Sequence, residues 1–235
     1  MASKPGERKL QILQTLAAML EQPQGEKITT AALAARLECS EAALYRHFAS
    51  KAKMFEGLIE FIETSLLGLI NQITAEEEMG LKQVELILHL LLGFAQRNRG
   101  MTRVLTGDAL VHENERLQAR INLLLEKLEA ALRQSLKVAA TQEGLSPATD
   151  FAALANLLLC HVSGRWQQYA KSGFSREPLA QWPQQWPMLY GACLSQATCF
   201  PIAMDNEKGR RGALFHWSKR PLTCAATPPH PGRSR

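Results

Sequence analysis

The feature that most constrains the fold is a long apolar stripe in residues 117–136. Apolar residues recur there every three or four positions, which is the period of one face of an α-helix. They are Leu117, Ile121, Leu124, Leu128, Leu132 and Leu136. The same spacing recurs along most of the chain, and no convincing run of alternating Val, Ile or Thr residues occurs. The sequence therefore predicts an all-α fold.

Breaks in this spacing divide the chain into helices. Pro23 and Gly25 end the first helix, Thr29 or Thr30 caps the second, and Ser40 caps the third. The expected helices cover about residues 7–21, 30–36, 40–47, 51–73, 81–97, 100–112, 117–136, 150–171 and 182–196. We expect a domain over residues 6–50, a second helical domain over residues 51–200, and a tail over residues 201–235.

The positive charge is concentrated in that tail. The chain has a formal net charge of +5, and residues 201–235 hold seven basic and two acidic side chains, so the remaining residues are balanced. The tail is rich in Pro, Arg and Gly without helical spacing, which predicts a disordered basic segment. A nucleic-acid function must therefore rest on local patterning in the rest of the chain.

The cysteines and the apolar runs indicate a cytoplasmic protein. There are five cysteines, an odd number, without a CxxC pair, and no secretory signal opens the chain. The longest apolar runs are interrupted by His89 and Asn156. A membrane span needs about 20 apolar residues, so we expect none.

The segment "SEAALYRHFASK", residues 40–51, gives the first functional hypothesis. Three short helices with a tight turn between the second and third form a helix-turn-helix. Its recognition helix would be Glu41–His47, with Leu44 and Phe48 packed against the other two helices. Small, basic and hydrogen-bonding side chains are left for a major groove and its phosphates. The candidate DNA-binding residues are Thr29, Thr30, Ser40, Glu41, Ala42, Tyr45, Arg46, His47 and Lys51.

Residues 28–59, "ITTAALAARLECSEAALYRHFASKAKMFEGLI", resemble the DNA-binding domain of TetR-family regulators. The Thr-capped second helix and the Tyr-x-His-Phe-x-Ser-Lys pattern carry the resemblance. Glu38 stands at the turn position where the family usually has Gly, which eases a left-handed backbone. Ala49 replaces a frequent Pro. The resemblance implies an all-α dimer whose C-terminal part usually binds a small inducer.

The likeness extends to the nucleoid occlusion factors within this family. The stretches "LIEFIE.SL", "LLLGF..RN.G.TR.LTG.AL" and "RLQ.RIN.L.E..EA.LRQ" carry it, over about residues 7–196. It implies a homodimer that binds pseudo-palindromic chromosomal sites on the nucleoid and blocks assembly of the division protein FtsZ. The dimer interface would be a four-helix arrangement of residues 150–171 and 182–196.

A second apolar stripe suggests where such a partner would bind. At 100° per residue, residues 81–98 place a core stripe on one face and Leu86, Leu90, Gly93 and Arg97 roughly opposite. Gly93 would leave a notch for an approaching backbone. With Phe61 and Asn98, these residues are the candidate site for the C-terminal tail of FtsZ. Burial of both stripes in an ordinary core is the alternative, and Leu69 stands where nucleoid occlusion factors can carry Arg.

An enzyme is not expected, because no phosphate-binding Gly loop, HExxH or GxSxG motif occurs. His89 and His161 lie in apolar helices and fit half-buried side chains better than metal ligands, so no metal or cofactor is expected. The remaining alternative is a repressor released by a small-molecule inducer, with Trp166 and Tyr169 lining its pocket. Packing in a dimer interface is the interpretation we favour for these two rings.

Overall fold

The structure is a computed structural model that describes residues 5–22, 28–111, 113–142 and 149–195. Across these ranges the regular structure is helical, without strands. The elements are α1 (Pro5–Leu20), α2 (Thr30–Arg36), α3 (Glu41–Tyr45), α4 (Lys51–Glu76), α5 (Gly80–Arg97), α6 (Arg99–Leu105), the 3-10 helix η1 (Asp108–Leu110), α7 (Glu115–Gln142), α8 (Phe151–Lys171) and α9 (Trp182–Ser195). The all-α prediction is confirmed.

Side-chain caps begin four of these helices. The side-chain oxygens of Thr29, Ser40 and Ser50 accept hydrogen bonds from backbone N–H groups of the first turns of α2, α3 and α4, at 3.1–3.2 Å. Asp150 caps α8 in the same way. Each cap satisfies a backbone donor that has no partner within its helix. The caps predicted at Thr29 and Ser40 are confirmed.

Several expected boundaries were wrong. The third helix ends at Tyr45, so Arg46 and His47 belong to the following turn. The fourth helix continues to Glu76 instead of ending at 73. The expected helix over 100–112 is divided into α6 and η1 by Gly107, which has a positive φ of 82°. The predicted tail over 201–235 lies outside the described residues.

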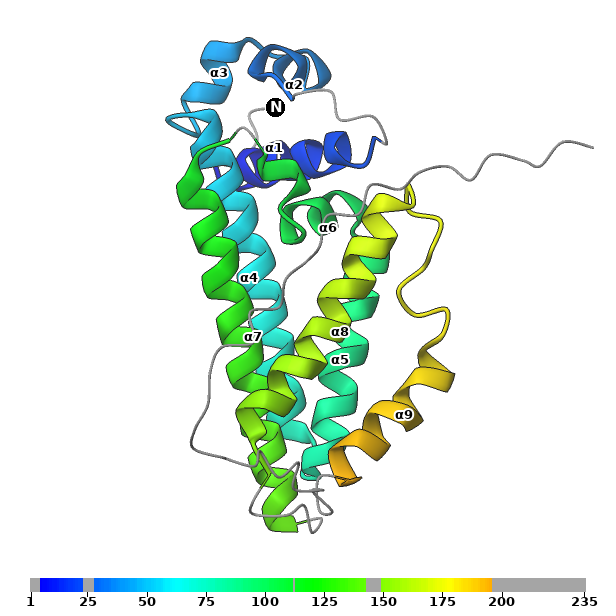
Figure 1. The fold of residues 1–235 in the computed structure, drawn as a ribbon. Coiled ribbons are helices and arrows are strands. Elements are labelled where there is room, and N and C mark those ends of the chain that lie inside the picture. Colours follow the sequence, from blue (N-terminus) through cyan, green and yellow to red (C-terminus); the bar gives the residue numbers. More distant parts are fainter. Residues whose placement is uncertain (1–4, 23–27, 112, 143–148, 196–235) are drawn as a thin grey trace, which may run out of the picture. The chain divides into compact units, whose positions relative to one another are not determined.

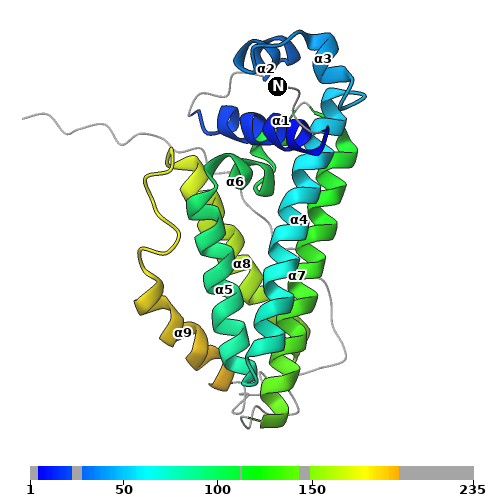
Figure 2. The same cartoon turned by 180° about the vertical axis from the view of Figure 1, so that it is seen from behind.

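In the helical bundle α7 packs against α5, α8 and α4, and α9 contacts α5. Helix α8 crosses in front of α5 in Figure 1 (Figures 1 and 2). The buried faces of these helices are built mainly from Leu, Ile, Val and Ala, whereas the described buried residues of α9 are Trp182 and Cys193. The apolar stripe of residues 117–136 forms the buried face of α7, since all six of its apolar residues are buried. Within the described residues, no helix is long and apolar enough to cross a membrane.

The α1–α6 contact joins the N-terminal helices to the rest of the bundle. Gly100 of α6 lies against the α1 backbone so closely that a Cβ there would be 1.9 Å from the carbonyl oxygen of Ala17. Arg103 donates from Nη1 to the carbonyl oxygens of Leu20 and Gln22, which lie at and just beyond the end of α1. Because these carbonyls have no partner within α1, Arg103 ties the end of α1 to α6.

Candidate nucleic-acid interface

Two apolar side chains hold α3 in place. Leu44 is fully buried. Phe48 is half-buried, with its ring beside Gly57 of α4 and with the ammonium of Lys9 at 5.9 Å from the ring centroid. A helix of five residues is too short to be stable in isolation. Packing through Leu44 and Phe48, as the sequence predicts, therefore fixes its orientation.

The turn between α2 and α3 has the left-handed backbone expected at this position. Glu38 has a φ of 51°, one of two non-glycine residues with positive φ among the described residues. Its side chain is exposed. A residue with a Cβ pays roughly 1 kcal/mol for this conformation, and the Ser40 cap and buried Leu44 on the following helix offset that cost.

The outer surface of this motif presents the predicted DNA-reading residues. The side chains of Glu41, Ala42, Tyr45 and Arg46 are exposed, and that of His47 is half-buried. Thr30 donates a 2.5 Å hydrogen bond to the Glu41 carboxylate, which links α2 to α3. The assignment of these residues to DNA remains a prediction, and their exposure on one short helix and its turn is what such a surface requires.

Lys51 has a partner that the sequence does not reveal. It begins α4, and its ammonium forms an ion pair with Glu113, which precedes α7; both side chains are largely buried. The ammonium also lies 5.7 Å from the centroid of the Phe55 ring. A phosphate would therefore have to compete with Glu113 for Lys51. The two residues are 62 positions apart, so no local pattern could have identified this pair.

The candidate partner face is on α4 and α5. The buried stripe of α5 faces α7 and α8, and Trp166 of α8 donates from Nε1 to the carbonyl oxygen of Leu91 at 3.1 Å. Leu86, Leu90 and Arg97 lie roughly opposite that stripe. Arg97 is exposed and Leu86 is half-buried. Leu90 is half-buried and packs against the core, so it is less separate from the core than expected.

Phe61 lies on the neighbouring helix α4. On the α7 side of α4, Glu63 forms ion pairs with Arg120 and Lys127, and these cations hold the pKa of Glu63 below its ordinary value. Phe61 is about 200° away around the helix, on the side of α4 opposite to Glu63. With 40% of its side chain exposed, Phe61 is available to a partner, as is the nearby Leu69, which is 43% exposed.

Gly93 and Asn98 differ from the sequence expectation. Gly93 is buried, and a Cβ there would lie 3.5 Å from the Leu179 side chain in the loop before α9. The expected notch beside Gly93 is thus occupied by this chain's own residue. Asn98 ends α5 and donates from Nδ2 to the carbonyl oxygen of Phe94 at 2.8 Å. Only its remaining polar groups could meet a partner.

Trp166 and Tyr169 lie inside the chain, which corrects the interpretation that they pack in a dimer interface. Both rings are 1% exposed. Besides the Trp166 bond to α5, the Tyr169 hydroxyl donates to the carbonyl oxygen of Gln96 at 3.0 Å and accepts from Arg99 Nε. The two rings therefore fasten α8 to α5.

The two histidines of the apolar helices have different surroundings. His89 is exposed, with its ring 5.9 Å from that of Trp182. His161 is half-buried, and burial, followed by the nearby Arg165, lowers its pKa. Among the described residues, no group of three or more His, Cys, Asp or Glu side chains is placed to hold a metal ion.

Two family models match different parts of the chain. Residues 12–58 match the family described as bacterial regulatory proteins, tetR family. Residues 78–193 match the family described as tetracyclin repressor-like, C-terminal domain. The first match contains the helix-turn-helix, and the second contains α5 to most of α9.

Solved structures confirm the fold. A FadR transcriptional regulator from Bacillus subtilis, in complex with stearoyl-CoA, superposes with a TM-score of 0.67 over 77% of this chain and 96% of its own, at 12% identity. A TetR transcription regulator from Haloarcula marismortui also gives 0.67, over 80% and 99% of the two chains, at 16% identity.

Curated relatives are much closer in sequence. The nucleoid occlusion factor SlmA of Alteromonas mediterranea is 52% identical over 79% of this chain and 95% of its own length. The SlmA protein of a Marinomonas species is 50% identical over 80% and 96%. The chain therefore belongs to the TetR family of helix-turn-helix proteins and, within it, to the SlmA nucleoid occlusion factors.

Proposed function

We propose that the protein is a nucleoid occlusion factor: a dimer that reads pseudo-palindromic chromosomal sites and blocks FtsZ assembly over the nucleoid. The observation that carries the proposal is the pairing of an exposed α3 surface with sequence identity of about half to SlmA proteins over nearly their full length. Those relatives are named as nucleoid occlusion factors and not as enzymes, and their names favour this function over an inducer-released repressor.

The DNA part of the proposal rests on α3. Tyr45 at the end of α3 and Arg46 in the turn that follows it are exposed, and packing through buried Leu44 fixes the direction of the helix. Ala42, one turn from Arg46, is small enough to let the helix backbone enter the groove. We assign base reading to Glu41, Ala42 and Arg46, and phosphate contacts to Tyr45 and Lys51.

The FtsZ part of the proposal rests on the α4–α5 face. An exposed aromatic side chain, Phe61, and two half-buried leucines, Leu86 and Leu90, would contact apolar residues of an extended peptide. Arg97 would meet an acidic residue of the FtsZ tail. These side chains lie on the long helices and not on α3, so one dimer could hold DNA and FtsZ together.

The test uses Phe61→Ala and Arg97→Asp. Leu90→Glu is a poorer probe because Leu90 packs against the core. That substitution would lower the stability of the protein as well as its affinity for FtsZ. We expect each of the two variants to weaken FtsZ binding about tenfold or more, equivalent to losing a hot-spot contact. Site-specific DNA affinity and melting temperature should stay unchanged. FtsZ sedimentation with and without specific DNA, together with DNA titrations, measures these effects.

Matched controls are available on α7. Leu123→Ala removes an apolar side chain that is 55% exposed, and Arg133→Asp reverses an exposed charge. Both should leave FtsZ binding intact. Normal FtsZ binding by the Phe61 and Arg97 variants would refute the assigned face, while failure of the unmodified protein to bind FtsZ at all would refute the function.

A further inference from the structure

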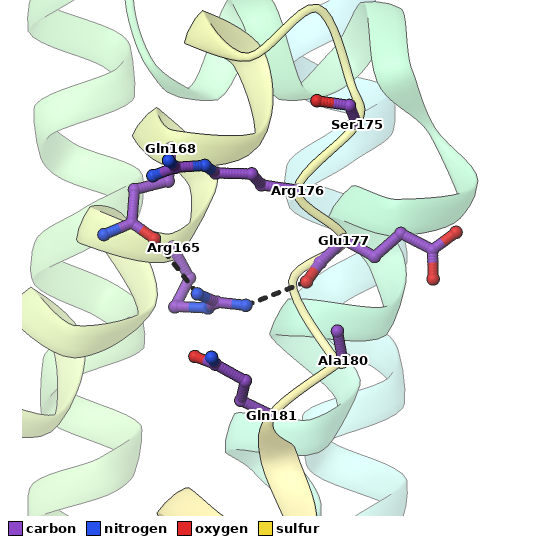
Figure 3. Close-up of a pocket in the computed structure, with 7 residues that line it drawn as sticks. All are labelled: Arg165, Gln168, Ser175, Arg176, Glu177, Ala180 and Gln181. Atoms are coloured by element: carbon purple, nitrogen blue, oxygen red, sulfur yellow. Dashed lines mark hydrogen bonds between the residues drawn. The ribbon is translucent and has the colours of Figure 1, made fainter.

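A polar pocket of about 530 Å³ lies between the C-terminal half of α8 and the loop that leads into α9 (Figure 3). Arg165 and Gln168 line it from α8. The other side is lined by Ser175, Arg176, Glu177, Ala180 and Gln181. The pocket belongs neither to the DNA-reading surface on α3 nor to the α4–α5 face.

Arg165 brings a buried positive charge to this pocket. Its side chain is 9% exposed, and its guanidinium donates to neutral oxygens. Nε bonds the carbonyl of Pro178 at 3.3 Å, Nη2 bonds the carbonyl of Glu177 at 2.8 Å, and Nη1 bonds the Gln168 side chain at 3.0 Å. These carbonyls hold the loop on α8. They do not neutralise the charge, and a buried unpaired charge is costly.

Arg176 adds a second positive charge to the same pocket. Burial, followed by repulsion from Arg176, lowers the pKa of Arg165. Neither arginine forms an ion pair with an acid of the described residues. The adjacent Glu177 carboxylate points away from the pocket, where it accepts from Gln96 Nε2 at 3.2 Å (Figure 3). Glu177 is the one acid of the lining, and it forms an ion pair with neither guanidinium group.

We infer that this pocket binds a small anion that carries a phosphate group. A doubly charged phosphate matches two guanidinium groups in charge, and guanidinium donors suit its oxygens. The Ser175 hydroxyl and the amides of Gln168 and Gln181 supply further polar groups. Ala180 is the one apolar side chain of the lining. The anion would fasten α8 to the loop that positions α9, an effect beyond the proposed function.

The first experiment uses inorganic pyrophosphate as the probe, with sodium chloride at matched ionic strength. At about tenfold excess over its Kd, binding should raise the melting temperature by roughly 3–6 °C. Arg176→Gln, at an exposed position, should leave the fold intact and weaken pyrophosphate binding about tenfold or more in calorimetric titration. Arg133→Gln on α7 is the matched control and should bind like the unmodified protein.

The second experiment supplies the negative charge from the protein itself. Gln181→Glu places a carboxylate in the pocket, which should raise the melting temperature without pyrophosphate and abolish its further effect. Gln184→Glu is the control, because residue 184 is in the first turn of α9 but outside the pocket lining. Its carboxylate is also stabilised by the positive end of the helix dipole. This variant should retain the response to pyrophosphate.

Three results would overturn the inference. They are an unmodified protein that does not respond to pyrophosphate, an equal response from the Arg176 and Arg133 variants, and a pyrophosphate response that persists in Gln181→Glu. A DNA duplex added in excess tests whether the pocket binds a small phosphate-containing anion or the phosphates of DNA. Undiminished pyrophosphate binding is expected, whereas competition by DNA would overturn the assignment to a small anion. None of these outcomes depends on FtsZ.

Discussion

Lys51 lies where a DNA phosphate and Glu113 would compete for one ammonium group. In the free protein, Glu113 holds it in a largely buried ion pair. A phosphate contact in the complex would exchange one acidic partner for another, and the counterions released from DNA would add to the gain. The affinity that Lys51 contributes is therefore reduced by the cost of leaving Glu113.

This arrangement predicts opposite effects for the two partners. Lys51→Ala should weaken binding to all sequences and reduce the slope of log affinity against log salt by about 1. Glu113→Gln should strengthen DNA binding, because it frees the ammonium. The gain should vanish in the double variant, since coupled residues are not additive. Tyr45→Ala serves as a control that weakens binding with an unchanged slope. An unaltered slope in Lys51→Ala would show that Lys51 stays with Glu113 on DNA.

At the scale of elements, the α1–α6 contact determines how the DNA-reading helices are attached. Gly100→Ala would put a Cβ 1.9 Å from the Ala17 carbonyl oxygen, and backbone cannot move aside as a flexible side chain can. We expect α1 to shift, a loss of about 1–3 kcal/mol in the free energy of unfolding, and weaker DNA binding.

Gly68→Ala is the matched control for this prediction. It lies within α4, and a Cβ there would meet no atom within 4 Å. Replacing Gly by Ala in an open helical position should stabilise the protein by roughly 0.5–1 kcal/mol. Chemical denaturation of both variants gives the comparison, and equal effects of the two substitutions would show that α1 and α6 can separate without cost.

For the whole molecule, the question is how two copies assemble. Leu157 on α8 is 53% exposed, and Met188 on α9 is 73% exposed. We expect a second copy of the chain to cover these large apolar side chains. The resulting dimer would present two α3 helices, one to each half-site of the DNA.

Leu157→Glu and Met188→Glu should each shift the protein from dimer to monomer at micromolar concentration, measured by light scattering. Specific DNA affinity should fall strongly, because each copy would then bind one half-site alone. Leu123→Glu, on an α7 position of similar exposure, should remain dimeric. A monomeric unmodified protein would rule out the assembly itself.

The sequence by itself determined the local structure. Spacing of apolar residues placed the helices, because each α-helix must bury one face, and Ser, Thr and Pro marked where several begin or end. The left-handed turn at Glu38 was implied by the resemblance to TetR-family domains, which usually have Gly at this position. The boundaries at Tyr45 and Glu76 were missed, because the last turn of a helix depends on what packs against it.

Tertiary structure decided the contacts between distant residues. From the sequence, Trp166 and Tyr169 were expected to pack in a dimer interface. Their polar groups instead donate hydrogen bonds to carbonyl oxygens on α5, some 75 residues away in the chain. Leu179 fills the space beside Gly93, and Glu113 pairs with Lys51. Helical spacing reports which face is buried and not which partner buries it. Such partners are set by how the helices cross, which local sequence does not encode.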